Sequence, residues 1–222
     1  MSPTAVLFDF DGVIADSENY HVVAWQRTLV RMGWELSDQA AAPAAEMDDH
    51  AFAVELFARR GLEEADVDAW ARAKQELTVR MIQLHPRIYP GVSELLHALS
   101  GRARVAVVST TWRENVEAFL DAAGLASLVK SIVGKDDVES PSPAPDAHRL
   151  AVKRLKAAVG RTVAVSGSPR GLAAAESAGV SRLAVGHRRE HGDWVGEARF
   201  VPSFESLPDV LAQLGFSDRN PS

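Results

Sequence analysis

Short apolar runs separated by helical patterns organise most of this chain. The runs are apolar throughout instead of alternating with polar residues, and they cover residues 5–8, 105–108, 131–133, 162–165, 182–185 and, less distinctly, 199–201. Strands buried on both faces have this composition, which is typical of a parallel sheet covered by helices. Amphipathic patterns over 114–123, 145–157 and 171–178 lie between successive runs. The alternation predicts an α/β fold with a Rossmann-like, doubly wound parallel sheet.

A helical insertion interrupts this alternation after the first strand. Residues 16–86 contain helical patterns only, over 20–32, 51–60 and 64–84, and their aromatic residues are expected to form a core. The acidic segment around Asp49 is expected to be an exposed loop. We therefore predict a core domain made of residues 1–15 and 87–222, with a helical cap domain, residues 16–86, inserted after the first strand.

Composition and charge exclude several classes of protein. A chain of 222 residues suits one large domain plus a small one, and its net charge of −6 argues against a non-specific nucleic-acid binder. The absence of cysteine excludes disulfides, thiolate metal sites and cysteine nucleophiles. The sequence shows neither a secretory signal nor an apolar run of the ~20 residues that span a bilayer, so we expect no membrane association and a cytoplasmic location. It indicates no oligomeric state.

Two carboxylates follow the first strand directly. Asp9 and Asp11 lie two residues apart, and Gly12 comes next. Active sites of open parallel sheets lie at the carboxyl ends of the strands. Buried carboxylates are costly unless a cation or a reaction uses them. One carboxylate can attack phosphorus to form an acyl phosphate, and the second can act as general acid and then general base.

The segment from Asp9 to Val13, Asp-Phe-Asp-Gly-Val, resembles the first motif of the haloacid dehalogenase superfamily. The following Asp16-Ser17-Glu18 is similar to its branch of β-phosphoglucomutases and sugar-phosphate phosphatases, and the resemblance covers nearly the whole chain. It implies that Asp9 is the nucleophile and Asp11 the acid/base. It also implies that Asp9 and the main chain of Asp11 are ligands of Mg²⁺, and that the substrate is a small phosphorylated metabolite.

The second strand ends in a hydroxyl-rich segment. Ser109 matches the family's Ser/Thr that binds the transferring phosphoryl group, and Thr110 is the adjacent main-chain donor. A Ser-Thr-Thr cluster can also cap the next helix, so both interpretations stay open. Arg113, just beyond, is a candidate for binding a second anionic group of a substrate, although a solvated arginine is the simpler interpretation.

The third and fourth motifs depart from the family pattern. In the third, the Pro-x-Pro-Asp frame is present, but Ser142 stands in the place of the lysine that neutralises the phosphoryl group. Ser142 could still donate one hydrogen bond to phosphate. In the fourth, Ser166 and Gly167 stand in the place of the acidic pair that holds Mg²⁺, and Arg170 lies in the same loop.

These losses leave alternatives open. Mg²⁺ prefers hard anionic oxygens, so its binding should be weak here, and a single lost charge contact typically costs ~100-fold in rate. The chain is either a hydrolase with weak or altered activity or a catalytically inactive relative that binds a small anionic ligand or a protein. Lys135, Arg113 or Arg170 could supply positive charge. The segment 187–191, with two histidines, is expected to be a solvated loop.

Overall fold

The chain forms two compact units in the computed structural model. The structure describes residues 2–45, 47, 49–62, 66–140, 142–187 and 198–216. One unit comprises Met1–Asp16 with Arg87–Ser222, and the other comprises Ser17–Pro86. The chain therefore leaves the first unit directly after the acidic segment that follows the first strand, and it returns seventy residues later.

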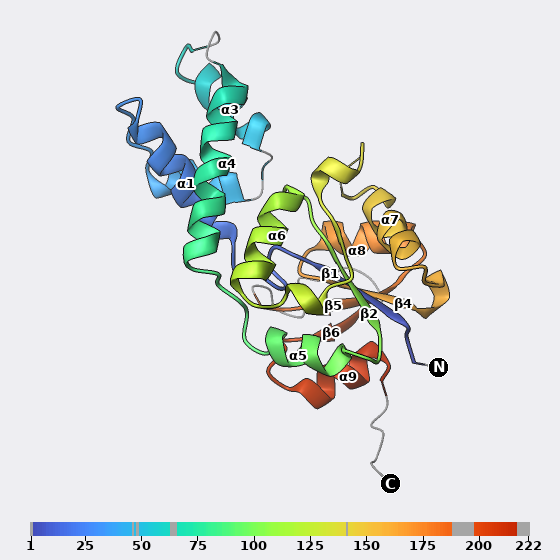
Figure 1. Ribbon diagram of the computed structural model, residues 1–222. Helices are drawn as coiled ribbons and strands as arrows, with labels where there is room; N and C mark the ends of the chain where they lie inside the picture. The colour runs from blue at the N-terminus through green and yellow to red at the C-terminus, as the bar shows by residue number, and fades with distance from the viewer. Residues whose placement is uncertain are drawn as a thin grey trace. The chain divides into compact units, whose positions relative to one another are not determined.

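The larger unit is built on a six-stranded sheet with the order β3-β2-β1-β4-β5-β6, in which every neighbouring pair is parallel (Figure 1). Its strands are β1 (Ala5–Asp9), β2 (Arg104–Val108), β3 (Ser131–Val133), β4 (Thr162–Ser166), β5 (Ser181–Val185) and β6 (Arg199–Val201). The predicted doubly wound parallel sheet is confirmed, including its short third and sixth strands.

Helices cover both faces of this sheet. They are α5 (Val92–Leu99), α6 (Arg113–Ala122), α7 (Asp146–Arg154), α8 (Pro169–Ser177) and α9 (Leu207–Leu214), with 3₁₀ turns at Ala126–Leu128, Lys135–Asp137 and Val159–Arg161. Ala5 and Leu7 pack into one core cluster with Ala151 of α7 and Ala175 of α8. Side chains alternate along a strand, so Asp9 points to this same face of the sheet.

On the opposite face, aromatic residues form the core. The ring of Phe8 meets Phe204 edge to face at 6.3 Å, and that of Phe10 meets Phe119 of α6 at 5.1 Å. Each of these four residues is at most 1% exposed. This packing fixes the residues on both sides of Asp9, so the position of its side chain is set by the two cores together.

The regular elements in the described part of the smaller unit are all helices, as the sequence pattern predicts. It contains α1 (Glu18–Val30), α2 (Asp38–Ala41), a 3₁₀ turn at Ala42–Ala45, α3 (Asp49–Ala58) and α4 (Val67–Leu84). Trp25, Leu29, Phe52 and Phe57 form its apolar core. Across the described residues of both units, no helix combines the length and the apolar character needed to cross a bilayer.

The helical unit also buries charge. Lys74 of α4 is fully buried, with its Nζ 2.7 Å from Oδ1 of Asp49 and 2.6 Å from Nδ1 of His21. The indole of Trp25 donates to the same Asp49 oxygen at 3.1 Å. The expectation that Asp49 lies in an exposed acidic loop is therefore wrong, because this carboxylate is the partner of a buried ammonium group.

Candidate active site

Asp9 ends β1 in contact with the end of β4. The hydroxyl of Ser166, the last residue of β4, donates a hydrogen bond to Oδ2 of Asp9. Burial raises the pKa of Asp9 to about 7, the bond from Ser166 acts in the opposite direction, and the charge of Asp11 adds to the increase. Near neutral pH this carboxyl group is thus a mixture of its ionised and protonated forms.

The first turn of α8 packs directly on Asp9. Ser168 caps this helix by accepting a hydrogen bond from the N–H of Gly171 at 3.0 Å, and Pro169 occupies the first helical position. A Cβ on Gly171 would lie 2.4 Å from Oδ2 of Asp9 and 2.2 Å from Oγ of Ser166. Only a residue without a side chain lets the helix come this close to the carboxylate.

Asp11 and Ser109 lie side by side at the ends of β1 and β2. The hydroxyl of Ser109 donates to Oδ2 of Asp11 at 3.3 Å and accepts from the N–H of Thr111 at 3.0 Å. The hydroxyl of Thr111 in turn accepts a hydrogen bond from the side chain of Asn115 at 2.8 Å. Thr110, which lies between Ser109 and Thr111 in the sequence, is exposed. The hydroxyl cluster does not occupy the capping position of α6, because Trp112 is the N-cap and Asp136 accepts from the N–H of Arg113.

Arg113 does not join this cluster. Its guanidinium donates to both carboxylate oxygens of Asp137, at 2.8 and 2.6 Å, and to the carbonyl of Ile132 at 2.7 Å. Arg154 donates to the same carboxylate at 2.6 Å. Burial raises the pKa of Asp137, but the bonds from Arg154 and Arg113 outweigh it and hold that pKa well below its usual range. The contacts of Arg113 tie α6 to the end of β3, which gives this arginine a structural role.

Two hydrogen bonds join Ser142 to Arg170, which lies at the start of α8. The hydroxyl of Ser142 donates to the carbonyl of Arg170 at 3.2 Å, and the guanidinium of Arg170 donates to the carbonyl of Ser142 at 2.7 Å. Lys135 lies with its Nζ 4.3 Å from the centre of the Trp112 ring. The structure thus brings a cation to residue 142, where the sequence has lost one.

His187 lies after β5 and is partly buried, which the sequence did not predict. Its ring stacks on Tyr89 with centroids 4.1 Å apart and meets Phe204 edge to face at 4.9 Å. Burial lowers the pKa of His187 to about 4, although Glu205 and a hydrogen bond to the main chain of Val13 oppose this change. The solvated-loop prediction is wrong for His187, and residues 188–191 lie outside the described part of the chain.

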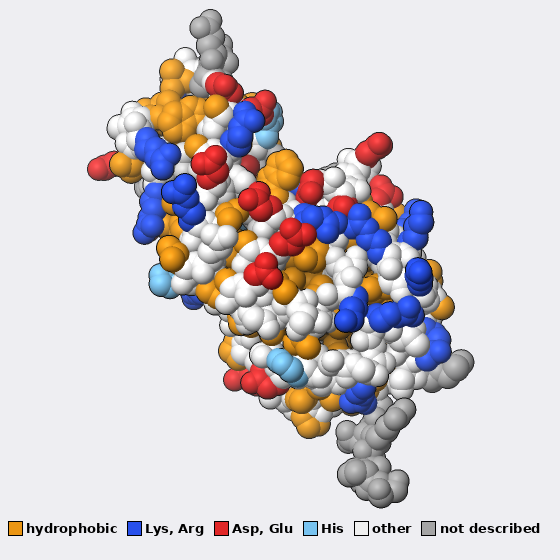
Figure 2. Space-filling model, in the orientation of Figure 1, with side chains coloured by type: hydrophobic (Ala, Val, Ile, Leu, Met, Phe, Trp, Pro, Cys, Tyr) orange, Lys and Arg blue, Asp and Glu red, His pale blue; other side chains and the backbone are white. Residues whose placement is uncertain are grey.

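The exposed charges of the larger unit are of both signs. Figure 2 shows acidic side chains over α6 and Lys and Arg side chains over α7. The exposed residues there include Glu114, Glu117 and Asp121 of α6 and Arg149, Lys153 and Arg154 of α7. The face seen in Figure 2 is therefore not the uniformly basic surface that a non-specific nucleic-acid binder needs.

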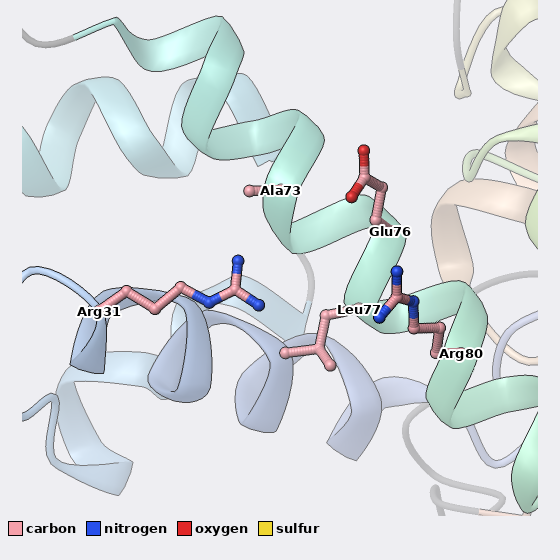
Figure 3. A pocket seen from close by; sticks show the side chains of 5 residues that line it. All are labelled: Arg31, Ala73, Glu76, Leu77 and Arg80. Carbon is pink, nitrogen blue, oxygen red and sulfur yellow. The ribbon is translucent and has the colours of Figure 1, made fainter.

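The helical unit has a shallow pocket of its own beside α4 (Figure 3). It is lined by Arg31, at the end of α1, and by Ala73, Glu76, Leu77 and Arg80 of α4. We assign no chemistry to this pocket.

Comparison with known proteins identifies the family. The sequence model of the haloacid dehalogenase-like hydrolases matches residues 6–185, which include Asp9, Ser109 and Ser166. The chain belongs to this family. Its first motif is the segment of Asp9 and Asp11, and its fourth is the loop of Ser166 and Gly171.

Similar proteins come from its phosphatase branch. The protein CbbY of Cereibacter sphaeroides is 30% identical over 217 residues, covering 91% of this chain and 93% of the relative. A phosphoglycolate phosphatase of Rhodospirillum rubrum is 30% identical over 220 residues, covering 94% and 91%. A crystal structure of CbbY from Rhodobacter sphaeroides in complex with phosphate matches with a TM-score of 0.80 and 28% identity, over 92% of this chain and 96% of that one. By fold and relatives, this chain is a haloacid dehalogenase-like hydrolase of the phosphoric monoester type.

The residues of this member do not fit the Mg²⁺ that the family uses. Within the described ranges, no group of three or more His, Cys, Asp or Glu side chains is placed to hold a metal ion. A hydroxyl, Ser166, lies on Oδ2 of Asp9 where the family has acidic residues. At Gly167 a Cβ would lie 2.7 Å from the carbonyl oxygen of Gly12, so this loop has no space for a carboxylate-bearing side chain without a shift. Asp9 and main-chain oxygens alone would make a weak site.

Proposed function

We propose that this protein hydrolyses a small phosphorylated metabolite through a phosphoryl group carried on Asp9. The observation that carries the proposal lies at the carboxyl ends of the neighbouring strands β2, β1 and β4. There the Ser166 hydroxyl donates to Asp9, and the Ser109 hydroxyl donates to Asp11. Named relatives act on small phosphate esters, and one CbbY crystal structure contains xylulose-(1,5)-bisphosphate. These relatives support the same chemical class of substrate here.

The proposed reaction has two steps. Oδ1 of ionised Asp9 attacks phosphorus while Oδ2 stays bonded to the Ser166 hydroxyl, and the bond from phosphorus to the leaving oxygen breaks. Asp11 gives its proton to that oxygen. A water molecule then attacks the phosphorus of the aspartyl phosphate, Asp11 takes its proton, and the carboxylate of Asp9 departs. The Ser109 hydroxyl, which donates to Asp11 at 3.3 Å in the free protein, turns its single proton to a phosphoryl oxygen when the substrate binds.

The replacement of the family's acids and lysine lowers the turnover that we expect. The residues do not fit Mg²⁺, so no step is assigned to the metal, and the developing charge is met by hydroxyl and main-chain donors and by nearby cations. Since electrostatic stabilisation is usually the largest catalytic contribution, we expect turnover at least ~100-fold below that of a member with all four motifs.

A second candidate function follows from the same losses. Ser142, Ser166 and Gly167 replace charged residues, and the carboxylate of Asp9 is already occupied by a hydroxyl. A catalytically inactive member that binds a small anionic ligand would show these features as well.

Turnover of a panel of phosphate monoesters, measured with Mg²⁺ and with a chelator, separates the two candidates. The hydrolase proposal predicts slow release of phosphate that disappears in Asp9→Asn and depends little on Mg²⁺. The inactive candidate predicts no release above the Asp9→Asn background with any ester. Asp121→Asn, an exposed residue of α6, serves as a control for the removal of one carboxylate from the same unit.

A further inference from the structure

We propose that Arg170 binds the phosphoryl group in place of the family's missing third-motif lysine. This inference rests on the proposed site at Asp9, and it adds a charged residue that the family pattern does not contain. It starts from a pair of contacts between two loops that are 28 residues apart in sequence.

The position of Arg170 is fixed at both of its ends. Its main chain lies one residue before Gly171, whose Cα is so close to Asp9 that a Cβ there would lie 2.4 Å from the carboxylate. Its guanidinium reaches across to residue 142 and donates to the Ser142 carbonyl at 2.7 Å. The positive charge therefore lies at the residue that replaces the lysine, on a side chain that starts one residue before the contact of α8 with Asp9.

The cation that is missing at residue 142 has a counterpart in the cation at residue 170. Residue 142 has lost the lysine ammonium, and residue 170, which contacts it, carries a guanidinium. A serine at 142 leaves space for the longer arginine side chain to approach the 142 carbonyl, whereas a lysine there would place a like charge beside it. The two loops thus still carry a cation, but it belongs to the loop after β4 instead of to residue 142.

A guanidinium suits this task. It presents five N–H donors in a planar fork, and the bond to Ser142 uses one of them. Paired donors match the geometry of two phosphoryl oxygens, and the group stays protonated at all relevant pH values. Arg170 is exposed, so a phosphate can reach it without unfolding of the loop.

The other nearby cations have different partners. Arg113 is bonded to both oxygens of Asp137, and the ammonium of Lys135 lies over the ring of Trp112. Neither contact joins the loop of Ser142 to the loop that follows β4. Of the three cations that the sequence offered, Arg170 is the one whose contacts fit the lysine's place.

Binding of inorganic phosphate to the full-length protein, measured by isothermal titration calorimetry at constant ionic strength, tests this role without requiring turnover. Arg170→Gln is expected to weaken phosphate binding about 10- to 100-fold, since a charge-assisted hydrogen bond is lost. Arg170→Lys should retain part of the affinity. The double variant Ser142→Lys with Arg170→Gln should recover it, because the cation then returns to the family's position.

Arg149→Gln is the matched control. Arg149 is also exposed and also donates to a main-chain carbonyl, that of Ser177 at 3.1 Å, but on the far end of α8. Thermal unfolding of each variant reports whether it is folded. The control is expected to bind phosphate as the unmodified protein does.

Several results would overturn the inference. They are unchanged phosphate binding by Arg170→Gln, an equal loss in Arg149→Gln, no recovery in the double variant, and no phosphate binding by the unmodified protein. The proposed function is judged separately by turnover that depends on Asp9. Phosphate binding that depends on Arg170, without any turnover, would support this inference and contradict the hydrolase proposal.

Discussion

The hydrogen bond between Ser166 and Asp9 connects a lost motif to the chemistry of the nucleophile. A carboxylate must be ionised to attack phosphorus, and burial raises the pKa of Asp9 to about 7. The Ser166 hydroxyl works against this increase by donating to the ionised form. The rate should therefore rise with pH through about 7, as the ionised fraction of Asp9 increases.

Replacement of Ser166 by alanine tests this link. Without the hydroxyl, the ionised form of Asp9 loses a donor, so its pKa rises further and the acidic limb of kcat/KM moves to higher pH. The pH profiles of the unmodified protein and of Ser166→Ala show this directly, with Ser203→Ala in an exposed loop as the control. An acidic limb that stays in place, or moves to lower pH, would contradict the role assigned to this bond.

A second buried group, His148 of α7, affects stability and has no assigned role in the reaction. It is 2% exposed, and in the described part of the chain neither of its ring nitrogens has a hydrogen-bond partner. Burial lowers the pKa of His148 to about 4, so the folded state disfavours the proton that the unfolded chain binds below about 6.5. The pH-dependent cost of this residue is therefore absent above pH 6.5, and it lowers the free energy of unfolding progressively as the pH falls toward 4.

His148→Leu should raise the free energy of unfolding by about 1–3 kcal/mol, because two unsatisfied buried polar atoms are removed. The gain should be larger at pH 5 than at pH 8. Urea unfolding at both pH values measures it, beside His97→Leu, which changes an exposed histidine. Equal or lower stability of His148→Leu at pH 5 would show that the imidazole is satisfied in solution.

At the scale of the element, the start of α8 determines how tightly the site is closed. Gly171 has no conformational requirement of its own, since its φ is not positive, but its lack of a side chain lets the helix touch Asp9 and Ser166. Pro169 and the Ser168 cap fix where the helix begins, so that its first turn lies against the carboxylate.

Gly171→Ala should therefore abolish turnover and destabilise the fold by about 1–3 kcal/mol, as overpacking does. Gly160→Ala is the matched control, because a Cβ there meets nothing within 4 Å. Activity assays and thermal unfolding of the two variants give the comparison. A Gly171→Ala protein with normal stability and turnover would mean that the helix is not held against Asp9.

Element positions were largely predictable from sequence because the strands are buried on both faces. Such strands are apolar throughout, and the helices between them have clear amphipathic patterns. The run at residues 199–201 was the least distinct, and it forms the edge strand β6. Helix starts were less exact: α8 begins at Pro169, two residues before the pattern predicts, because a serine cap and a proline define its start.

At the scale of the whole molecule, the site residues come from loops after strands that are neighbours in space but distant in sequence. The expectation that Asp9, Asp11 and Ser109 lie together depends only on parallel strands, whose carboxyl ends share one edge. Pairings such as Arg113 with Asp137, or Lys74 with Asp49, could not be predicted, since an isolated sequence gives no sign of which charges are buried together.

The fold and the family thus agree, while the charge distribution around Asp9 is that of an unusual member. A hydroxyl, a glycine and a relocated cation stand where the family has acids and a lysine. The proposal that Asp9 still carries a phosphoryl group is the claim on which the account depends.

Detection of that phosphoryl group is its most direct test. The protein is mixed with acetyl phosphate as a small phosphoryl donor and quenched in acid, and its peptides are analysed by mass spectrometry. The account predicts one added phosphoryl group on the peptide that contains Asp9, lost on treatment with hydroxylamine and absent from Asp9→Asn. An unmodified peptide, or the same modification in Asp9→Asn, would contradict it.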